Sequence, residues 1–235
     1  MKTPTSMLRL KGFRFPSKII AYAVRAYHRF AMSTADVRDL LAERGVIVSR
    51  EAIRLWVNRV GSYFANCVRR DRPRPNGKRH LDEVVNSTRG KKHWLWRAID
   101  ADKDVLDIFV QTRRNAKAAK RFPERLITQV GEPRIVITDK AAISSRSKHW
   151  HQTLTTAPLK GLNNVIEGWH RPTRKREKIF SRFKSHRRAQ RFLSAHDQIN
   201  LIFRPRRFQL TANSYCHARA DAFSLWAEYT MEMVA

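Results

Sequence analysis

Three carboxylates at separate places in the chain have the side-chain type that metal-dependent phosphodiester chemistry needs. Asp82 lies inside an apolar segment, Asp139 follows the apolar run 134–138, and Glu167 lies near the start of a later helical pattern. Two Mg²⁺ ions about 4 Å apart need a bridging carboxylate and one more on each side. Such ions activate a water or a 3′-hydroxyl and stabilise the leaving oxygen. Brought together by the fold, the three side chains would suit a two-metal site.

The two aspartates differ as candidates when each is considered alone. Asp82 is more simply explained as a solvent-facing strand residue, because successive strand side chains point to opposite faces. Asp139 is the better candidate, because open α/β sheets place their sites just beyond the carboxyl ends of strands. The sequence therefore predicts a site that depends on strands which must bring distant carboxylates together.

The segment 80–112 predicts a three-stranded antiparallel meander that carries Asp82. Its strands are expected at 81–86, 93–99 and 105–111, with turn residues between them. A helix from Asn115 to about Gln129 should follow, with a kink or break at Pro123. The short apolar strand 134–138 is expected in the middle of a sheet.

The N-terminal region predicts three helices that resemble a helix-turn-helix arrangement. Ser17 and Ser49 are expected to cap the first and third helices, and Gly45 to end the second. A helix-turn-helix domain places the start of its last helix in the major groove of DNA. A plain three-helix bundle with a charged face is the alternative. The candidate DNA contacts on the third helix are Arg50, Arg54 and Arg59, and Arg50, Glu51 and Arg54 at its start are the candidate base readers.

The charge balance points to a polyanionic partner. The chain has 48 Lys and Arg against 20 Asp and Glu, which gives a formal net charge of +28. Nucleic acid is the leading partner, because the sequence has neither a long apolar run nor a separate basic amphipathic anchor for a membrane. Cys67 and Cys216 form no CxxC pair, so free buried thiols are expected rather than a disulfide or a zinc site. Without a signal-peptide pattern, the expected location is cytoplasmic, in association with the nucleoid.

The residues in this order resemble a DDE transposase of a bacterial insertion sequence, in the IS six family. The similarity extends over nearly the whole chain and rests on several segments. These are RFPSKIIAYAV, HLDE, KKHWLWRAID, RRNAKAAKRF, VITDK, KGLNN, IEGWHRPTRKREK and RFLSAHDQIN.

The resemblance implies a DNA strand transferase and nuclease with an RNase H-like, mixed-sheet catalytic fold of the α+β class. It assigns Asp82, Asp139 and Glu167 as the catalytic, metal-binding triad for two Mg²⁺ or Mn²⁺ ions. Arg174, seven positions after Glu167, is expected to contact DNA near the site. The other DNA-binding candidates in this basic segment are Lys175, Arg176 and Lys178. Expected partners are double-stranded DNA, as terminal inverted repeats and target, and further copies of the chain in a dimer or larger assembly.

The expected domain organisation has five parts. These are a basic leader at 1–16, a helix-turn-helix domain at 17–70, a basic linker at 71–79, a catalytic domain at 80–205 and a helical extension at 206–235. Only 28 positions (167 − 139) separate the last two carboxylates. A DNA-binding remnant without catalysis is therefore an alternative, and a helix-turn-helix transcriptional regulator is a second.

Overall fold

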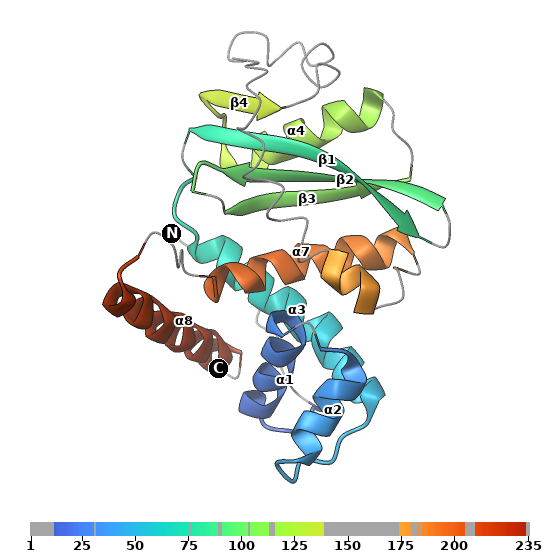
Figure 1. The fold of residues 1–235 in the computed structure, drawn as a ribbon, viewed down its shortest axis with the longest axis vertical. Coiled ribbons are helices and arrows are strands. Elements are labelled where there is room, and N and C mark those ends of the chain that lie inside the picture. Colours follow the sequence, from blue (N-terminus) through green and yellow to red (C-terminus); the bar gives the residue numbers. More distant parts are fainter. Residues whose placement is uncertain are drawn as a thin grey trace. The chain divides into compact units, whose positions relative to one another are not determined.

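The computed structural model describes residues 12–30, 32–75, 77–88, 91–102, 104–112, 116–138, 174–179, 183, 185–204 and 210–233. The chain folds as two compact units. One consists of Met1–Arg72 with Ser194–Ala235, and the other of Pro73–Leu193. Figure 1 labels the helices and strands of both units. The helical unit is therefore built from two segments that are far apart in the sequence.

The first three helices follow the local signals of the sequence. They are α1 (Ser17–Arg29), α2 (Thr34–Ala42) and α3 (Arg50–Asp71). The side chain of Ser33 forms a capping box with Asp36, and the Ser49 hydroxyl accepts a hydrogen bond from the Ala52 N–H at 3.2 Å. Gly45 has a φ of 74°, so the predicted left-handed helix end is confirmed. The predicted Ser17 cap is wrong, because the N-cap position is Pro16 and no side chain caps this helix.

The C-terminal helix α8 (Ala212–Glu232) belongs to the same unit as α1 and α3. The ring of Trp226 stacks on Phe64 with centroids 3.8 Å apart, and the Tyr63 hydroxyl donates a hydrogen bond to the Tyr229 carbonyl at 3.3 Å. Arg70 forms an ion pair with Glu232 at 2.9 Å. These contacts pack α8 against α3.

The second unit contains a four-stranded mixed sheet with the order β3-β2-β1-β4. The strands are β1 (Lys78–Thr88), β2 (Lys91–Asp100), β3 (Val105–Gln111) and β4 (Ile135–Thr138). The first three pair antiparallel, which confirms the predicted meander, and β4 pairs parallel with β1. Among the described strands β4 lies at an edge, so its predicted central position is wrong there. The predicted α+β class with a mixed sheet is confirmed.

Helix α4 (Ala116–Val130) connects β3 to β4 and covers one face of the sheet (Figure 1). The prediction at Pro123 was a kink or a break, and the helix continues through this residue without a break. The apolar core under this helix offsets the hydrogen bond that proline removes. The buried residues of this core are Leu81, Trp96, Ala98, Leu106, Phe122, Leu126 and Val136.

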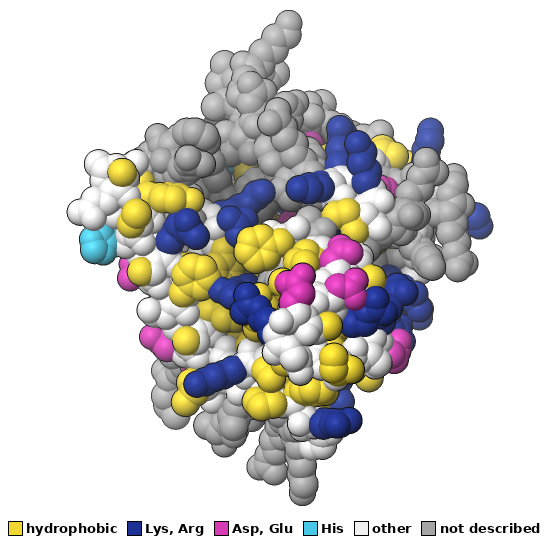
Figure 2. Space-filling view, turned by 60° about the horizontal axis from the view of Figure 1, so that its bottom comes forward, with side chains coloured by type: hydrophobic (Ala, Val, Ile, Leu, Met, Phe, Trp, Pro, Cys, Tyr) yellow, Lys and Arg dark blue, Asp and Glu magenta, His cyan; other side chains and the backbone are white. Residues whose placement is uncertain are grey.

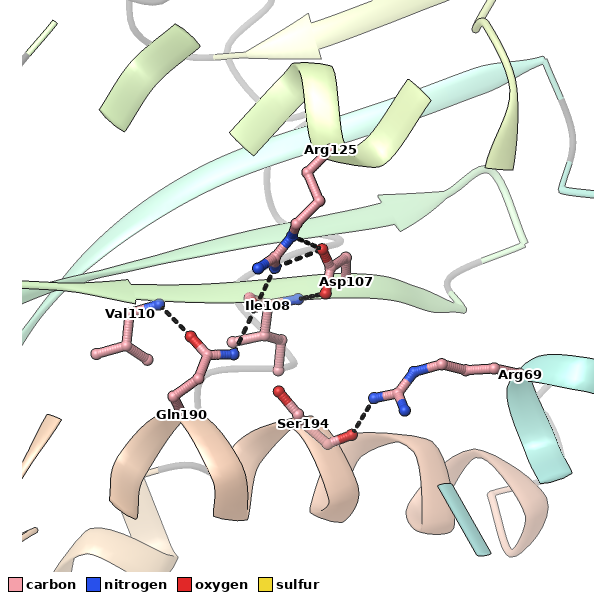
Figure 3. A network of polar contacts seen from close by, with 7 residues as sticks. All are labelled: Arg69, Asp107, Ile108, Val110, Arg125, Gln190 and Ser194. Carbon is pink, nitrogen blue, oxygen red and sulfur yellow. Dashed lines mark hydrogen bonds and ion pairs between the residues drawn. The ribbon is translucent and has the colours of Figure 1, made fainter. Parts of the chain in front are cut away.

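Polar side chains protect the edge strand β3. The side-chain amide of Gln190, on α7 (His186–Ile202), accepts a hydrogen bond from the Val110 N–H at 2.7 Å and donates one to the Ile108 carbonyl at 2.8 Å (Figure 3). From α4, Arg125 donates to the same carbonyl and forms an ion pair with Asp107. The unpaired backbone groups of an edge strand can pair with another chain and cause aggregation. These side chains instead form hydrogen bonds with backbone groups of β3.

We predict that Gln190→Ala lowers the free energy of unfolding by about 1–3 kcal/mol, because it leaves the Val110 N–H without its partner. Urea denaturation at pH 7.5 measures this change. Gln129→Ala is the control, because Gln129 is exposed near the end of α4 and should change stability little. Equal stability of the two variants would contradict a structural role for the two hydrogen bonds between Gln190 and β3.

Candidate active site

Asp82 lies on the central strand β1, between β2 and β4. Its neighbour Leu81 is fully buried in the core beneath α4, so Asp82 is on the opposite face of the sheet. The Asp82 side chain is half-buried, and one of its oxygens accepts a hydrogen bond from the Glu83 N–H at 2.8 Å. Asp82 is therefore held at a sheet face rather than being fully exposed in solvent.

The parallel pairing of β1 with β4 ends one residue before each of the two predicted aspartates. The last paired residues are Leu81 and Thr138, and the next residues in the sequence are Asp82 and Asp139. Asp139 and Glu167 themselves lie outside the described residues. The structure thus places one member of the predicted triad and ends β4 immediately before another.

Buried polar residues surround Asp82 that the sequence reasoning did not single out. His80 lies two residues earlier on the same face and is 4% exposed, while Arg97 is the cross-strand partner of Asp82 on β2 and is 0% exposed. Arg97 could have been found from the sequence, because it is the one charged residue in the otherwise apolar run 94–99. This face of the sheet therefore carries a cation beside the candidate carboxylate.

His93 lies on β2 on the same face as Asp82, and its ring stacks on that of His186 with centroids 5.9 Å apart. Burial lowers the pKa of His93 below its ordinary value, and His186 and Lys91 act in the same direction. Burial also lowers the pKa of His80, with a further contribution from Lys78. Both imidazoles are thus kept neutral when the protein is folded near pH 7.

The candidate DNA contacts on α3 are exposed. Arg50, Arg54 and Arg59 lie outside the buried stripe of this helix. The Arg54 side chain pairs with Glu51, and this hydrogen bond lowers the pKa of the Glu51 carboxyl. Arg59 lies over the ring of Phe13 at 5.7 Å. Figure 2 shows one face of the molecule, on which Lys and Arg side chains lie beside exposed hydrophobic ones.

The candidate DNA contacts of the second basic segment lie in a short helical stretch, 174–179. Arg174, Lys175 and Lys178 are exposed, whereas Arg176 is 0% exposed and its guanidinium lies 5.4 Å from the ring centre of Phe192. A buried guanidinium packed on an aromatic ring contributes to the fold. The three exposed side chains are the ones that solvent, or a phosphate, can reach.

The described residues contain neither a ready-made metal cluster nor a membrane-spanning helix. Among them, no group of three or more His, Cys, Asp or Glu side chains could hold a metal ion. No helix in the described part of the chain combines the length and apolar character needed to cross a bilayer. Both cysteines are free, as predicted. Cys67 is buried, whereas Cys216 is exposed, so its predicted burial is wrong.

The sheet and its carboxylate lie within a segment that matches a known family. A DDE domain matches residues 76–206, which include all four described strands. The chain is also 30% identical over 214 residues to the transposase for insertion sequence-like element IS431mec of Staphylococcus aureus, covering 87% of this chain and 93% of that protein. The transposase for insertion sequence element IS257 in transposon Tn4003 of Staphylococcus aureus has the same identity and coverage.

Two solved structures show weaker similarity. The HTLV-2 integrase catalytic core domain in complex with magnesium has a TM-score of 0.34 and 12% identity, covering 45% of this chain and 82% of that one. The simian T-cell lymphotropic virus intasome in complex with PP2A regulatory subunit B56 gamma has a TM-score of 0.43 and 14% identity, covering 76% of this chain and 68% of that one.

The matched segment defines a protein with a DDE domain, the class that combines a nuclease and a strand transferase and depends on divalent metal. The chain belongs to the transposases of the IS six family of insertion sequences. The predicted family is therefore confirmed. The helix-turn-helix assignment of α2 and α3 remains a prediction.

We predict that the protein loses stability as the pH falls from 7.5 to 5.5. The pKa of His93 is lowered in the folded state, so below about pH 6.5 the unfolded chain binds a proton that the folded chain does not. His93→Gln should reduce this pH dependence in urea denaturation. The exposed His217 provides the control, and an unchanged pH dependence in His93→Gln with a reduced one in His217→Gln would refute the assignment.

Proposed function

We propose that this chain binds the terminal inverted repeats of its insertion sequence and catalyses metal-dependent DNA strand cleavage and strand transfer. Asp82, Asp139 and Glu167 are the catalytic carboxylates. Membership of the transposase family supports the reaction class. The position of Asp82 on the sheet supports the site.

The single observation that carries the assignment of the site is the register between β1 and β4. Leu81 pairs with Thr138, and each is followed by an aspartate. Neighbouring strands lie about 4.8 Å apart, and paired residues direct their side chains to the same face. A register continued by one residue would set Asp82 and Asp139 beside each other on the face opposite α4. One cation could then bind both carboxylates.

The donor chemistry fits a hard divalent cation. Asp82 offers carboxylate oxygens from a rigid central strand, and Mg²⁺ and Mn²⁺ both prefer such ligands. When bound, two such ions activate the attacking oxygen and stabilise the leaving one. The Glu83 N–H restrains the Asp82 side chain from one side.

DNA binding is the task of the exposed basic side chains. Arg50, Arg54 and Arg59 lie on α3, whose buried stripe packs against α1 and α2 and so keeps the helix in a fixed orientation within its unit. Arg174, Lys175 and Lys178 supply a second basic group. The net charge of +28 favours double-stranded DNA as the partner and a location at the nucleoid. Because two element ends are processed together, the active form is a dimer or a larger assembly.

We predict that Asp139→Asn lowers metal-dependent nicking of a terminal-repeat duplex by about 100-fold or more, because a carboxylate that binds the ions is lost. Nicking is followed on a labelled duplex with Mg²⁺ or Mn²⁺. DNA affinity, measured by fluorescence anisotropy, should be unchanged.

Asp102→Asn is the matched control, because Asp102 is exposed in the β2–β3 turn. Normal nicking by Asp139→Asn would show that the assigned mechanism is wrong. A wild-type chain that binds the repeat but never nicks it would identify a non-catalytic DNA-binding remnant.

We predict that Arg50→Ala weakens binding to the terminal repeat by about 1–3 kcal/mol, with a smaller loss on unrelated DNA, because a base contact carries sequence information. Lys175→Ala, as a phosphate contact, should weaken both kinds of DNA alike. Anisotropy titrations at several salt concentrations measure the two variants. Arg38→Ala on the exposed face of α2 serves as the control. If Arg50→Ala lowered the affinity for terminal-repeat DNA and for unrelated DNA equally, Arg50 would not be a residue that reads bases.

A further inference from the structure

Two buried arginines on the sheet each pair in register with an aspartate. Arg79 on β1 is opposite Asp100 on β2, and Asp82 on β1 is opposite Arg97 on β2. Alternation along the strands puts the Arg79 pair on the α4 face and the Arg97 pair on the other face. Arg79 is 1% exposed and Arg97 is 0% exposed, so both guanidinium groups are removed from water.

In the Arg79 pair, burial and the opposite aspartate have opposing effects on the buried guanidinium. Burial lowers the pKa of Arg79, and the charge of Asp100 opposes this change. Arg79 also donates a hydrogen bond to the Val130 carbonyl at 2.9 Å. The paired aspartate therefore acts on the buried arginine across the strands, as the register requires.

The surroundings of Arg97 on its own face of the sheet are mostly apolar. Its neighbours along β2 are Leu95 and Ile99, and its partner on β3 is Ile108; all three are buried. Among the described strand residues of this face, Asp82 is the only acidic side chain. Paired residues in an antiparallel sheet have Cα atoms about 4.5–5.5 Å apart, with both side chains on the same face. Asp82 is thus the carboxylate within closest reach of Arg97 along the sheet.

We propose that Arg97 is the counter-ion of Asp82 and a positioning residue of the proposed active site, which holds this carboxylate until a divalent cation binds. The inference rests on the proposed function, because it takes Asp82 as a metal ligand. Burying a charge is costly unless the charge is paired. The pair meets this requirement in the metal-free protein, and it keeps Asp82 from turning away from the site.

The same charge has a second consequence, which is a limit on metal affinity. A cation beside a metal-binding carboxylate repels an incoming dication, and this repulsion is large where the dielectric constant is low. Removing the charge of Arg97 while keeping a polar side chain should therefore tighten metal binding. A residue that served only packing would weaken metal binding when replaced, because the site would lose its order.

The test measures Mn²⁺ binding to the full chain without DNA, with unbound Mn²⁺ quantified by its EPR signal. We expect Arg97→Gln to bind Mn²⁺ about fivefold more tightly than the wild type, and Arg97→Lys, which retains the charge, to stay within about twofold of it. Arg79→Gln is the matched control on the opposite face, with lower stability and unchanged Mn²⁺ affinity. Unchanged or weaker binding by Arg97→Gln would overturn the proposal.

A double-mutant cycle on stability provides a second, metal-free measurement. Asp82→Asn should restore part of the stability that Arg97→Gln loses, because removing one partner of a buried pair leaves the other charge uncompensated. Strictly additive losses would overturn the pairing. If Arg97→Gln alone fails to fold, recovery of folding in the double variant supports the pair, and a double variant that also fails to fold counts against it.

Asp82→Asn alone separates this inference from the proposed function. Loss of Mn²⁺ binding in Asp82→Asn with no effect of Arg97→Gln would reject only the role of Arg97. Wild-type Mn²⁺ binding by Asp82→Asn would reject Asp82 as a ligand, and with it the proposed site.

Discussion

The position of β1 between β2 and β4 is the constraint on which the rest of the catalytic unit depends. Its antiparallel pairing with β2 follows from a short connection, whereas its parallel pairing with β4 requires the crossover through α4. A slip of one residue would move Asp82 under α4 and Leu81 to the opposite face. The apolar core beneath α4 therefore fixes the register, and the register fixes where the carboxylate lies.

Charge within this sheet is arranged in opposed pairs rather than kept at the surface. Two arginines and two aspartates occupy β1 and β2 in reciprocal order, one pair on each face. A buried arginine without a partner would cost free energy of folding. An aspartate opposite it lowers that cost, and the arginine in turn restrains the aspartate side chain. A largely buried sheet can in this way carry a carboxylate on an inner strand together with an arginine opposite it.

On α3, the helical unit keeps its buried packing residues apart from the exposed basic ones. The buried stripe of α3 packs against α1 and α2, and its C-terminal half is stacked against α8 through Phe64 and Trp226. Arg50, Arg54 and Arg59 lie outside that stripe. The helix that carries these exposed arginines is thus packed against other helices along most of its length. The last helix of the chain is part of this packing.

The sequence by itself determined whatever depends on neighbours in the chain. Hydrophobic periodicity predicted the meander and the first helices, Ser49 and Gly45 marked helix ends, and the order of motifs identified the family. Tertiary structure decided what depends on contacts between distant residues. It carried α4 through Pro123 over an apolar core, placed β4 at the edge of the described sheet, buried Arg176 against Phe192, and set Arg97 opposite Asp82. Local propensity cannot specify these outcomes, because each is stabilised by a partner that only the fold brings near.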